Sequence, residues 1–206
     1  DEVCFSRGGQ RKNDYVVAEK SSTDQLTKGV WNSVTIAITD CAYSGKLRLG
    51  ITGSISKKPN DPHQFYIDDL NVVETIIDGD RYTMSFEPYE LGTKLSMNTN
   101  GASITVSDTE RRAGYQSAKF VTLGSDLNEA PQMVVNTFQI EPVKVEAGKR
   151  YRVSFWMLVP VGEPDYDIQF WLAATNGNKA FTARSPRKNL VCDTQTVTID
   201  EKGVWK

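Results

Sequence analysis

The chain has 206 residues, with 24 Lys and Arg against 26 Asp and Glu and a formal net charge of −2 at pH 7. That length suits one ordinary domain or two small ones. The near-neutral balance argues against nucleic acid as a partner, because phosphate binding needs an excess of basic residues. A single histidine, His63, makes a catalytic triad or a histidine-based metal centre a poor fit. We expect no membrane span, since no apolar run approaches the required length of about 20 residues.

Alternation of apolar and polar residues is the main secondary-structure signal. In chain order it occurs at residues 32–39, 102–107, 133–140, 150–159 and 166–173. Turn sequences punctuate the chain: Asn60-Asp61-Pro62, Ala147-Gly148-Lys149, Gly162-Glu163-Pro164 and Asn176-Gly177-Asn178. Many short strands separated by such turns predict an all-β sandwich.

The three cysteines, Cys4, Cys41 and Cys192, are spread along the chain and form no CxxC pair. Zinc and dithiol redox sites need clustered cysteines, so neither is supported. We expect small buried or half-buried thiols. A single disulfide is the alternative in a secreted protein, and the sequence does not select the pair.

The two ends of the chain carry the same short sequences in the same order. Arg11-Lys12-Asn13 and Lys28-Gly29-Val30-Trp31 recur as residues 187–189 and 202–205, at offsets of 176 and 174 residues. A duplicated segment at that separation predicts a tandem array of modules about that long. Trp31 and Trp205 follow a Lys-Gly turn in both copies, which favours a packing role for them.

Four further motifs appear in a recognisable order. Residues 64–74 read QFYIDDLNVVE, residues 85–87 read SFE, residues 110–120 read ERRAGYQSAKF and residues 147–156 read AGKRYRVSFW. In this order they resemble the closing strand, the opening strand, the G-x-x-S-x-K strand and the following G-x-x-Y-x-x-S-F-W strand of carbohydrate-binding modules of families 4, 9 and 22, as found in bacterial xylanases. The resemblance implies that residues 1–75 are the C-terminal part of one module and residues 82–206 the N-terminal part of the next.

This arrangement implies one jelly-roll β-sandwich that both pieces build in permuted order. Residues 66–70 and 84–87 would lie side by side across a linker near residues 75–81. The pieces could combine within one chain or by exchange between chains, as a strand-exchanged dimer. The duplicated segments, 1–31 and 181–206, would compete for one place.

Modules of this kind resemble clamps that hold a polysaccharide chain on a concave sheet face without cutting it. Aromatic rings stack on sugar rings while polar side chains bond the hydroxyl groups. Alternation in residues 168–172 places Ile168, Phe170 and Leu172 on one face of the strand and Gln169 and Trp171 on the other. If the first face is the core, Trp171 and Gln169 line the groove. The alternative is that Trp171 packs inside.

The resemblance adds further ligand-binding residues beyond the Asn176–Asn178 turn and in the first copy of the duplicated segment. They are Phe181 and Arg184, with Phe5 and Arg7 as their counterparts. Trp156 lies in a motif whose tryptophan is usually structural, so we expect it in the core.

The family also often carries a structural calcium ion, which prefers a cluster of hard oxygen ligands. Glu87, Glu110 and Asp68 match the positions expected to supply carboxylates. The alternative is that these three are ordinary carboxylates at strand ends.

Catalysis is the weaker interpretation, because glycoside hydrolysis normally needs two acidic groups flanking one bond. Glu163, Asp165 and Asp167 lie around a turn at Pro164, which suggests solvated side chains. We therefore predict a non-catalytic domain that binds xylan, or else β-glucan. The resemblance implies an attached glycoside hydrolase such as an endo-xylanase, and a secreted, periplasmic or bacterial cell-surface location. The alternatives are a structural or adhesive β-sandwich of a secreted protein, or a β-sandwich glycoside hydrolase.

Overall fold

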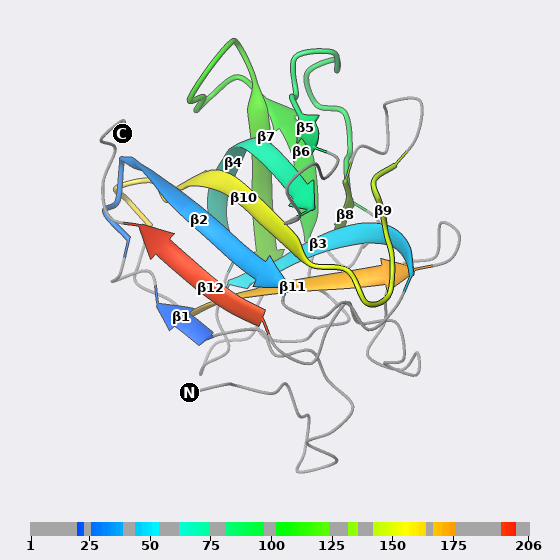
Figure 1. The fold of residues 1–206 in the computed structure, drawn as a ribbon. Coiled ribbons are helices and arrows are strands. Elements are labelled where there is room, and N and C mark those ends of the chain that lie inside the picture. The colour runs from blue at the N-terminus through cyan, green and yellow to red at the C-terminus, as the bar shows by residue number, and fades with distance from the viewer. Residues whose placement is uncertain are drawn as a thin grey trace.

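The computed structural model describes the central part of the chain in several stretches. They are residues 20–22, 26–38, 44–53, 62–74, 81–96, 102–123, 132–135, 142–163, 167–175 and 195–200. These residues form two antiparallel sheets and contain no helix (Figure 1). The predicted all-β class is therefore confirmed. No helix able to cross a membrane is found in the same stretches.

The smaller sheet has the strand order β1-β11-β3-β8, and β9 also pairs with β3. Its strands are β1 (Lys20–Ser22), β11 (Asp167–Thr175), β3 (Gly45–Gly53), β8 (Gln132–Val134) and β9 (Lys144–Val145).

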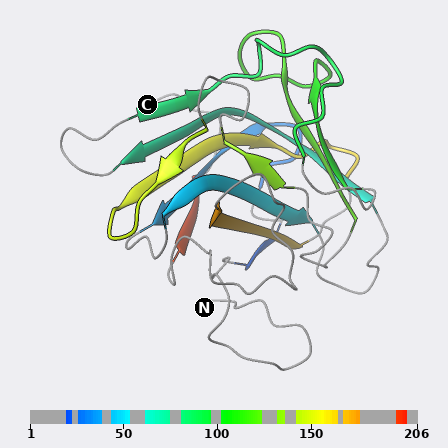
Figure 2. The same ribbon diagram turned by 90° about the vertical axis from the view of Figure 1, so that its right-hand side faces the viewer.

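The larger sheet has the order β12-β2-β10-β4-β7-β6, and β5 also pairs with β4. Its strands are β12 (Gln195–Asp200), β2 (Trp31–Ile38), β10 (Tyr151–Leu158), β4 (Pro62–Glu74), β7 (Ser117–Leu123), β6 (Ser103–Ser107) and β5 (Arg81–Met84). Figure 2 shows β3 and β11 beneath the curved strands of this sheet.

Strands from the two ends of the sequence are interleaved in both sheets. In the larger sheet β10 lies between β2 and β4, and in the smaller sheet β3 lies beside β11. Leu70 of β4 pairs with Met84 of β5, so the two segments expected to be neighbours across the linker are neighbours. Either part of the chain alone would therefore leave strand edges unpaired.

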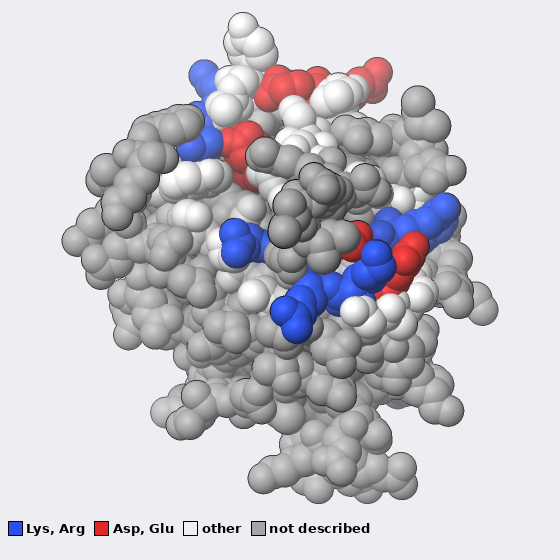
Figure 3. Space-filling model, in the orientation of Figure 1, with Lys and Arg blue, Asp and Glu red and all other residues white. Residues whose placement is uncertain are grey.

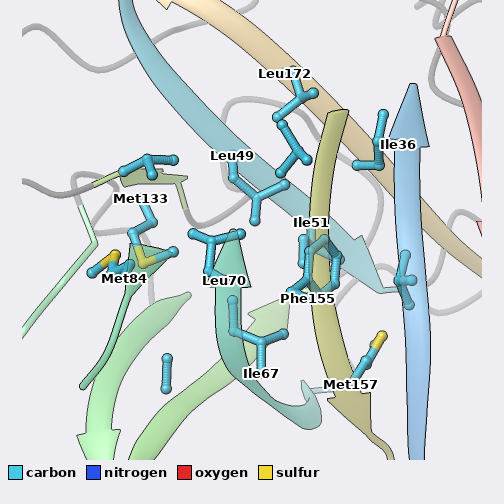
Figure 4. Packing of buried hydrophobic residues seen from close by; sticks show 14 of the residues in the cluster. Ile36, Leu49, Ile51, Ile67, Leu70, Met84, Met133, Phe155, Met157 and Leu172 are labelled. Atoms are coloured by element: carbon cyan, nitrogen blue, oxygen red, sulfur yellow. The ribbon is translucent and has the colours of Figure 1, made fainter. Parts of the chain in front are cut away.

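The core lies between the sheets and explains the alternation seen in the sequence. In β2 every second residue is buried, and β10 buries Tyr151, Val153, Phe155 and Met157 in the same way. Side chains from both sheets form one buried apolar cluster (Figure 4), with Leu49, Ile51, Met133 and Leu172 meeting Ile36, Ile67, Leu70 and Phe155. Burial of each such side chain stabilises the fold by about 1.5–3 kcal/mol.

Strand β4 contains a bulge that keeps its long apolar run directed into this core. Ser154 pairs with Asn71 and Trp156 with Asp68, so β4 has one residue more than β10 between these pairs. Asp69 lies in this bulge and has a φ of 51°, which is unusual for a residue other than glycine. As a result Ile67 and Leu70 are both fully buried although they are three residues apart.

The described strands of the two duplicated segments lie in different sheets. Strand β1, from the first copy, pairs with β11 at the edge of the smaller sheet. Strand β12, from the second copy, pairs with β2 at the edge of the larger sheet. Figure 1 shows both strands on the same side of the molecule. Most of both copies, together with Cys4, Cys41 and Cys192, lies outside the described residues.

Candidate functional site

The outer surface of the smaller sheet is the candidate ligand-binding surface, and β3 is its central strand. Leu47, Leu49 and Ile51 of β3 are fully buried in the core. Arg48 and Gly50 alternate with them and therefore belong to the outer surface. Arg48 is nonetheless fully buried, and desolvation lowers the pKa of its guanidinium group.

Two of the predicted ligand residues, Gln169 and Trp171, belong to β11, which pairs with β3. Trp171 pairs with Gly50, Gln169 with Thr52 and Ala173 with Arg48. On the other side of β3, Gln132 of β8 also pairs with Gly50. The backbone of β11 is described here, but the side chains of Gln169 and Trp171 are not, and the other four predicted ligand residues lie outside the described residues. Those four are Phe5, Arg7, Phe181 and Arg184.

Sequence reasoning missed Arg48. The signal was present, because Leu47-Arg48-Leu49-Gly50-Ile51 places an arginine between core residues of a strand. An arginine carries five N–H donors and suits hydroxyl or carboxylate partners. It does not act as a general acid or base, and because Arg48 is fully buried its guanidinium group can support this surface only from beneath.

The residues predicted to bind calcium lie at another place, where the loop between β6 and β7 (residues 108–116, the β6–β7 loop) meets β4. Asp68 is only 3% exposed. Its Oδ2 accepts hydrogen bonds from the backbone N–H groups of Arg112 (3.1 Å) and Ala113 (3.3 Å), and its Oδ1 accepts one from Asp69 (2.8 Å). Burial raises the pKa of the Asp68 carboxyl group, and these three donors partly oppose the rise.

Glu87 binds the same loop from the segment after β5. Its Oε1 accepts hydrogen bonds from the backbone N–H groups of Tyr115 (2.9 Å) and Gln116 (3.1 Å). Gly114 lies against this carboxylate with a φ of +67°, and a Cβ atom there would overlap Glu87 Oε1. The positive φ therefore favours glycine at position 114, and a Cβ atom there would displace the Glu87 carboxylate from its two backbone N–H donors.

The arrangement of Asp68, Glu87 and Glu110 in the structure does not fit a calcium site. The oxygens of Asp68 and Oε1 of Glu87 face backbone N–H groups, whereas the Glu110 backbone carbonyl accepts a hydrogen bond from Ser117 Oγ. Among the residues that the structure describes, no three His, Cys, Asp or Glu side chains are grouped so that they could hold a metal ion. The N–H donors occupy the oxygens that calcium would need, and the calcium site stays a prediction without support from this geometry.

Trp156 lies on the outer surface of the larger sheet and is half-buried, so its expected place in the core is wrong. Its neighbours Phe155 and Met157 are the core residues of β10. The guanidinium Cζ of Arg112 lies 4.0 Å from the centroid of the Trp156 ring, and Arg112 forms an ion pair with Asp69. An arginine from the β6–β7 loop thus covers the indole, which the pattern of β10 alone does not reveal.

Acidic and basic side chains are mixed on the described surface. Figure 3 shows red and blue side chains next to each other on the face seen in Figure 1. Lys149 Nζ and Glu74 Oε1, 2.9 Å apart, form one such pair. Glu163 is not solvated as expected: its side chain is 11% exposed, and its Oε2 lies 3.8 Å from His63 Nδ1. Asp165 and the side chain of Asp167 lie outside the described residues.

Comparison of the chain with models of protein families, with curated proteins and with solved structures finds no significant match. The resemblance to carbohydrate-binding modules therefore rests on the sequence motifs alone.

Proposed function

We propose that the chain is a non-catalytic polysaccharide-binding domain whose ligand lies across the outer surface of the smaller sheet. The fold we propose is a jelly-roll β-sandwich in permuted order, built from the end of one module and the start of the next. Xylan is the proposed ligand, ahead of β-glucan. An attached glycoside hydrolase would gain from the higher local concentration of its substrate, in a secreted or cell-surface setting.

One observation supports this proposal most directly. Strand β11 is an inner strand of the smaller sheet, with β1 on one side and β3 on the other. Its Leu172 is fully buried in the core, so the alternate backbone positions, 169 and 171, belong to the opposite surface. Position 171 pairs with Gly50, which has no side chain to compete for space above the sheet.

The proposed roles follow from residue chemistry. Trp171 would stack on the apolar face of a sugar ring, and Gln169 would bond its hydroxyl groups. Phe181 and Arg184, or Phe5 and Arg7, would extend the contact along the chain of sugars. Arg48, buried beneath this surface, would stabilise the site through hydrogen bonds.

Affinity electrophoresis in gels containing xylan, β-glucan or cellulose tests the proposal. We expect xylan to retard the wild-type chain most, and Trp171→Ala to weaken binding by about 10-fold or more, since stacking and burial of the ring are lost. Trp156→Ala is the matched control, because it removes a tryptophan from the larger sheet and should leave retardation unchanged.

Two results would overturn the proposal. Absence of retardation by all three polysaccharides would favour a structural or adhesive domain. Release of reducing sugar from the retained polysaccharide would favour a hydrolase.

A further inference from the structure

The turn that follows β10 (residues 159–163, the docking turn) binds a sequence from the other end of the chain. Lys28 Nζ donates a hydrogen bond of 2.6 Å to the backbone carbonyl of Glu163. The backbone N–H of Gly29 donates one of 2.7 Å to the carbonyl of Val159. These two residues begin the sequence Lys28-Gly29-Val30-Trp31 (the first KGVW), which leads into β2.

The docking turn selects the residue types of this sequence. Gly29 has a φ of +74°, and a Cβ atom there would lie 2.5 Å from Val161 Cγ2. Any other residue at this position meets both a strained backbone and a steric overlap. Trp31 pairs with Leu158 at the end of β10, which fixes the sequence in register with the larger sheet.

The same four residues recur as Lys202-Gly203-Val204-Trp205 (the second KGVW). Strand β12 ends at Asp200, which pairs with Ser33 of β2, two residues beyond Trp31. The described end of β12 therefore lies near the first KGVW, which contacts the docking turn. We propose that the docking turn is a recognition site for the KGVW sequence and that the second KGVW is its alternative occupant.

A difference between the copies explains why the first KGVW holds the site. Asn32 is 1% exposed. Its Nδ2 donates hydrogen bonds to the carbonyls of Val30 (2.8 Å) and Thr27 (3.1 Å), and its Oδ1 accepts one from the Thr27 N–H (3.1 Å). The repeat offset of 174 residues places Lys206 at the corresponding position of the second copy. The lysine ammonium group has three N–H donors but no acceptor, so it cannot accept the hydrogen bond that Asn32 Oδ1 accepts from the Thr27 N–H. The second KGVW is the weaker occupant.

A double-mutant cycle on the full chain tests this inference, which does not depend on the proposed function. Gly29→Ala weakens the first KGVW, and Gly203→Ala weakens the second. We expect Gly203→Ala to leave the urea midpoint of the wild type unchanged. In the Gly29→Ala background, where the second KGVW occupies the docking turn, it should lower the midpoint. Gly148→Ala in the turn before β10 is the control background, because Gly148 has a φ of +80° but a Cβ atom there meets nothing within 4 Å.

The location is tested by NMR with a synthetic peptide of residues 198–206 added to the Gly29→Ala/Gly203→Ala chain. We expect the amide signals of Val159, Val161, Gly162 and Glu163 to shift, and a peptide with Gly203→Ala to cause no shift. Lys28→Met replaces Gly29→Ala if the latter does not fold, since it removes the hydrogen bond from Lys28 Nζ to the Glu163 carbonyl and keeps Gly29. Equal effects of Gly203→Ala in all backgrounds, or no shift of these signals with either peptide, would overturn the inference.

Discussion

The guanidinium Cζ of Arg112 lies 4.0 Å from the centroid of the Trp156 ring, so a loop cation covers an indole on the outer surface of the larger sheet. Asp69, the bulge residue of β4, forms an ion pair with the same guanidinium group. The backbone N–H of Arg112 is bound by Asp68. The loop is thus fixed to β4 and β10 by both the backbone and the side chain of one residue.

Replacing Trp156 with leucine should destabilise the fold by about 0.5–2 kcal/mol, because the cation–π contact is lost while an apolar side chain remains. Arg112→Gln should cost more, since it also removes the ion pair with Asp69. Urea denaturation of the two single variants and the double variant gives the coupling between the residues. Arg111→Gln is the control: Arg111 is exposed and donates only to the Asp108 carbonyl among the described contacts. Additive effects of the two substitutions would contradict a direct interaction.

Gly114→Ala should be one of the most damaging glycine substitutions in the described part of the chain. The positive φ alone costs about 1 kcal/mol for a residue with a Cβ atom. The overlap with Glu87 Oε1 adds to this cost by displacing the acceptor of two backbone N–H groups. Gly92→Ala is the matched control, because Gly92 has a φ of +80° and a Cβ atom there meets nothing within 4 Å. Thermal unfolding should show a clearly larger loss for Gly114→Ala, and equal losses would mean that Glu87 does not hold the loop.

Chelation should leave the melting temperature unchanged, because backbone N–H groups already satisfy the oxygens of Asp68 and Oε1 of Glu87. The measurement is thermal unfolding with and without EDTA, followed by addition of excess calcium. A lower melting temperature in EDTA that calcium restores would show that a metal ion replaces these donors. The predicted site of Asp68, Glu87 and Glu110 would then be correct, and Glu87→Gln should abolish the calcium response.

The class of fold was predictable because its signal is local. The alternation of apolar and polar residues in the sequences of β2 and β10 predicts their alternating burial. The order of the motifs predicts that Leu70 and Met84 lie on neighbouring strands. The position of Trp156 was not predictable in the same way. Alternation alone separates it from Phe155 and Met157, but the resemblance to a structural tryptophan favoured the core, and only the tertiary structure brings Arg112 over the ring.

The candidate site was predictable only in outline. The alternation of Leu172 with Trp171 and Gln169 indicated the strand, but the pairing of Trp171 with Gly50 depends on register between segments more than 100 residues apart. Carboxylates at Asp68 and Glu87 have the composition of a metal site, whereas their partners are backbone N–H groups of a distant loop. Any residue except proline can supply a backbone N–H donor, so sequence motifs cannot distinguish a carboxylate that binds a metal ion from one that binds backbone N–H groups.

The pH dependence of the free energy of unfolding should reflect the titration of the Asp68 carboxyl group. Burial raises the pKa of this carboxyl group above its ordinary value of 3.8, so the folded chain keeps the proton to a higher pH than the unfolded chain does. Between pH 3.8 and the raised pKa the folded state binds more protons, and the free energy of unfolding therefore falls as pH rises through this window. Below this window both states are protonated, and the contribution of the group to stability is fully present.

Asp68→Asn removes the titration while keeping the size of the side chain. The free energy of unfolding of the wild type minus that of Asp68→Asn should be largest below pH 3.8, should fall as the folded group ionises, and should then stay constant. Urea denaturation across this range measures the difference directly. A difference that rises with pH would mean that the N–H groups of Asp69, Arg112 and Ala113 outweigh desolvation, because the carboxylate would then be more stable in the folded chain than in water.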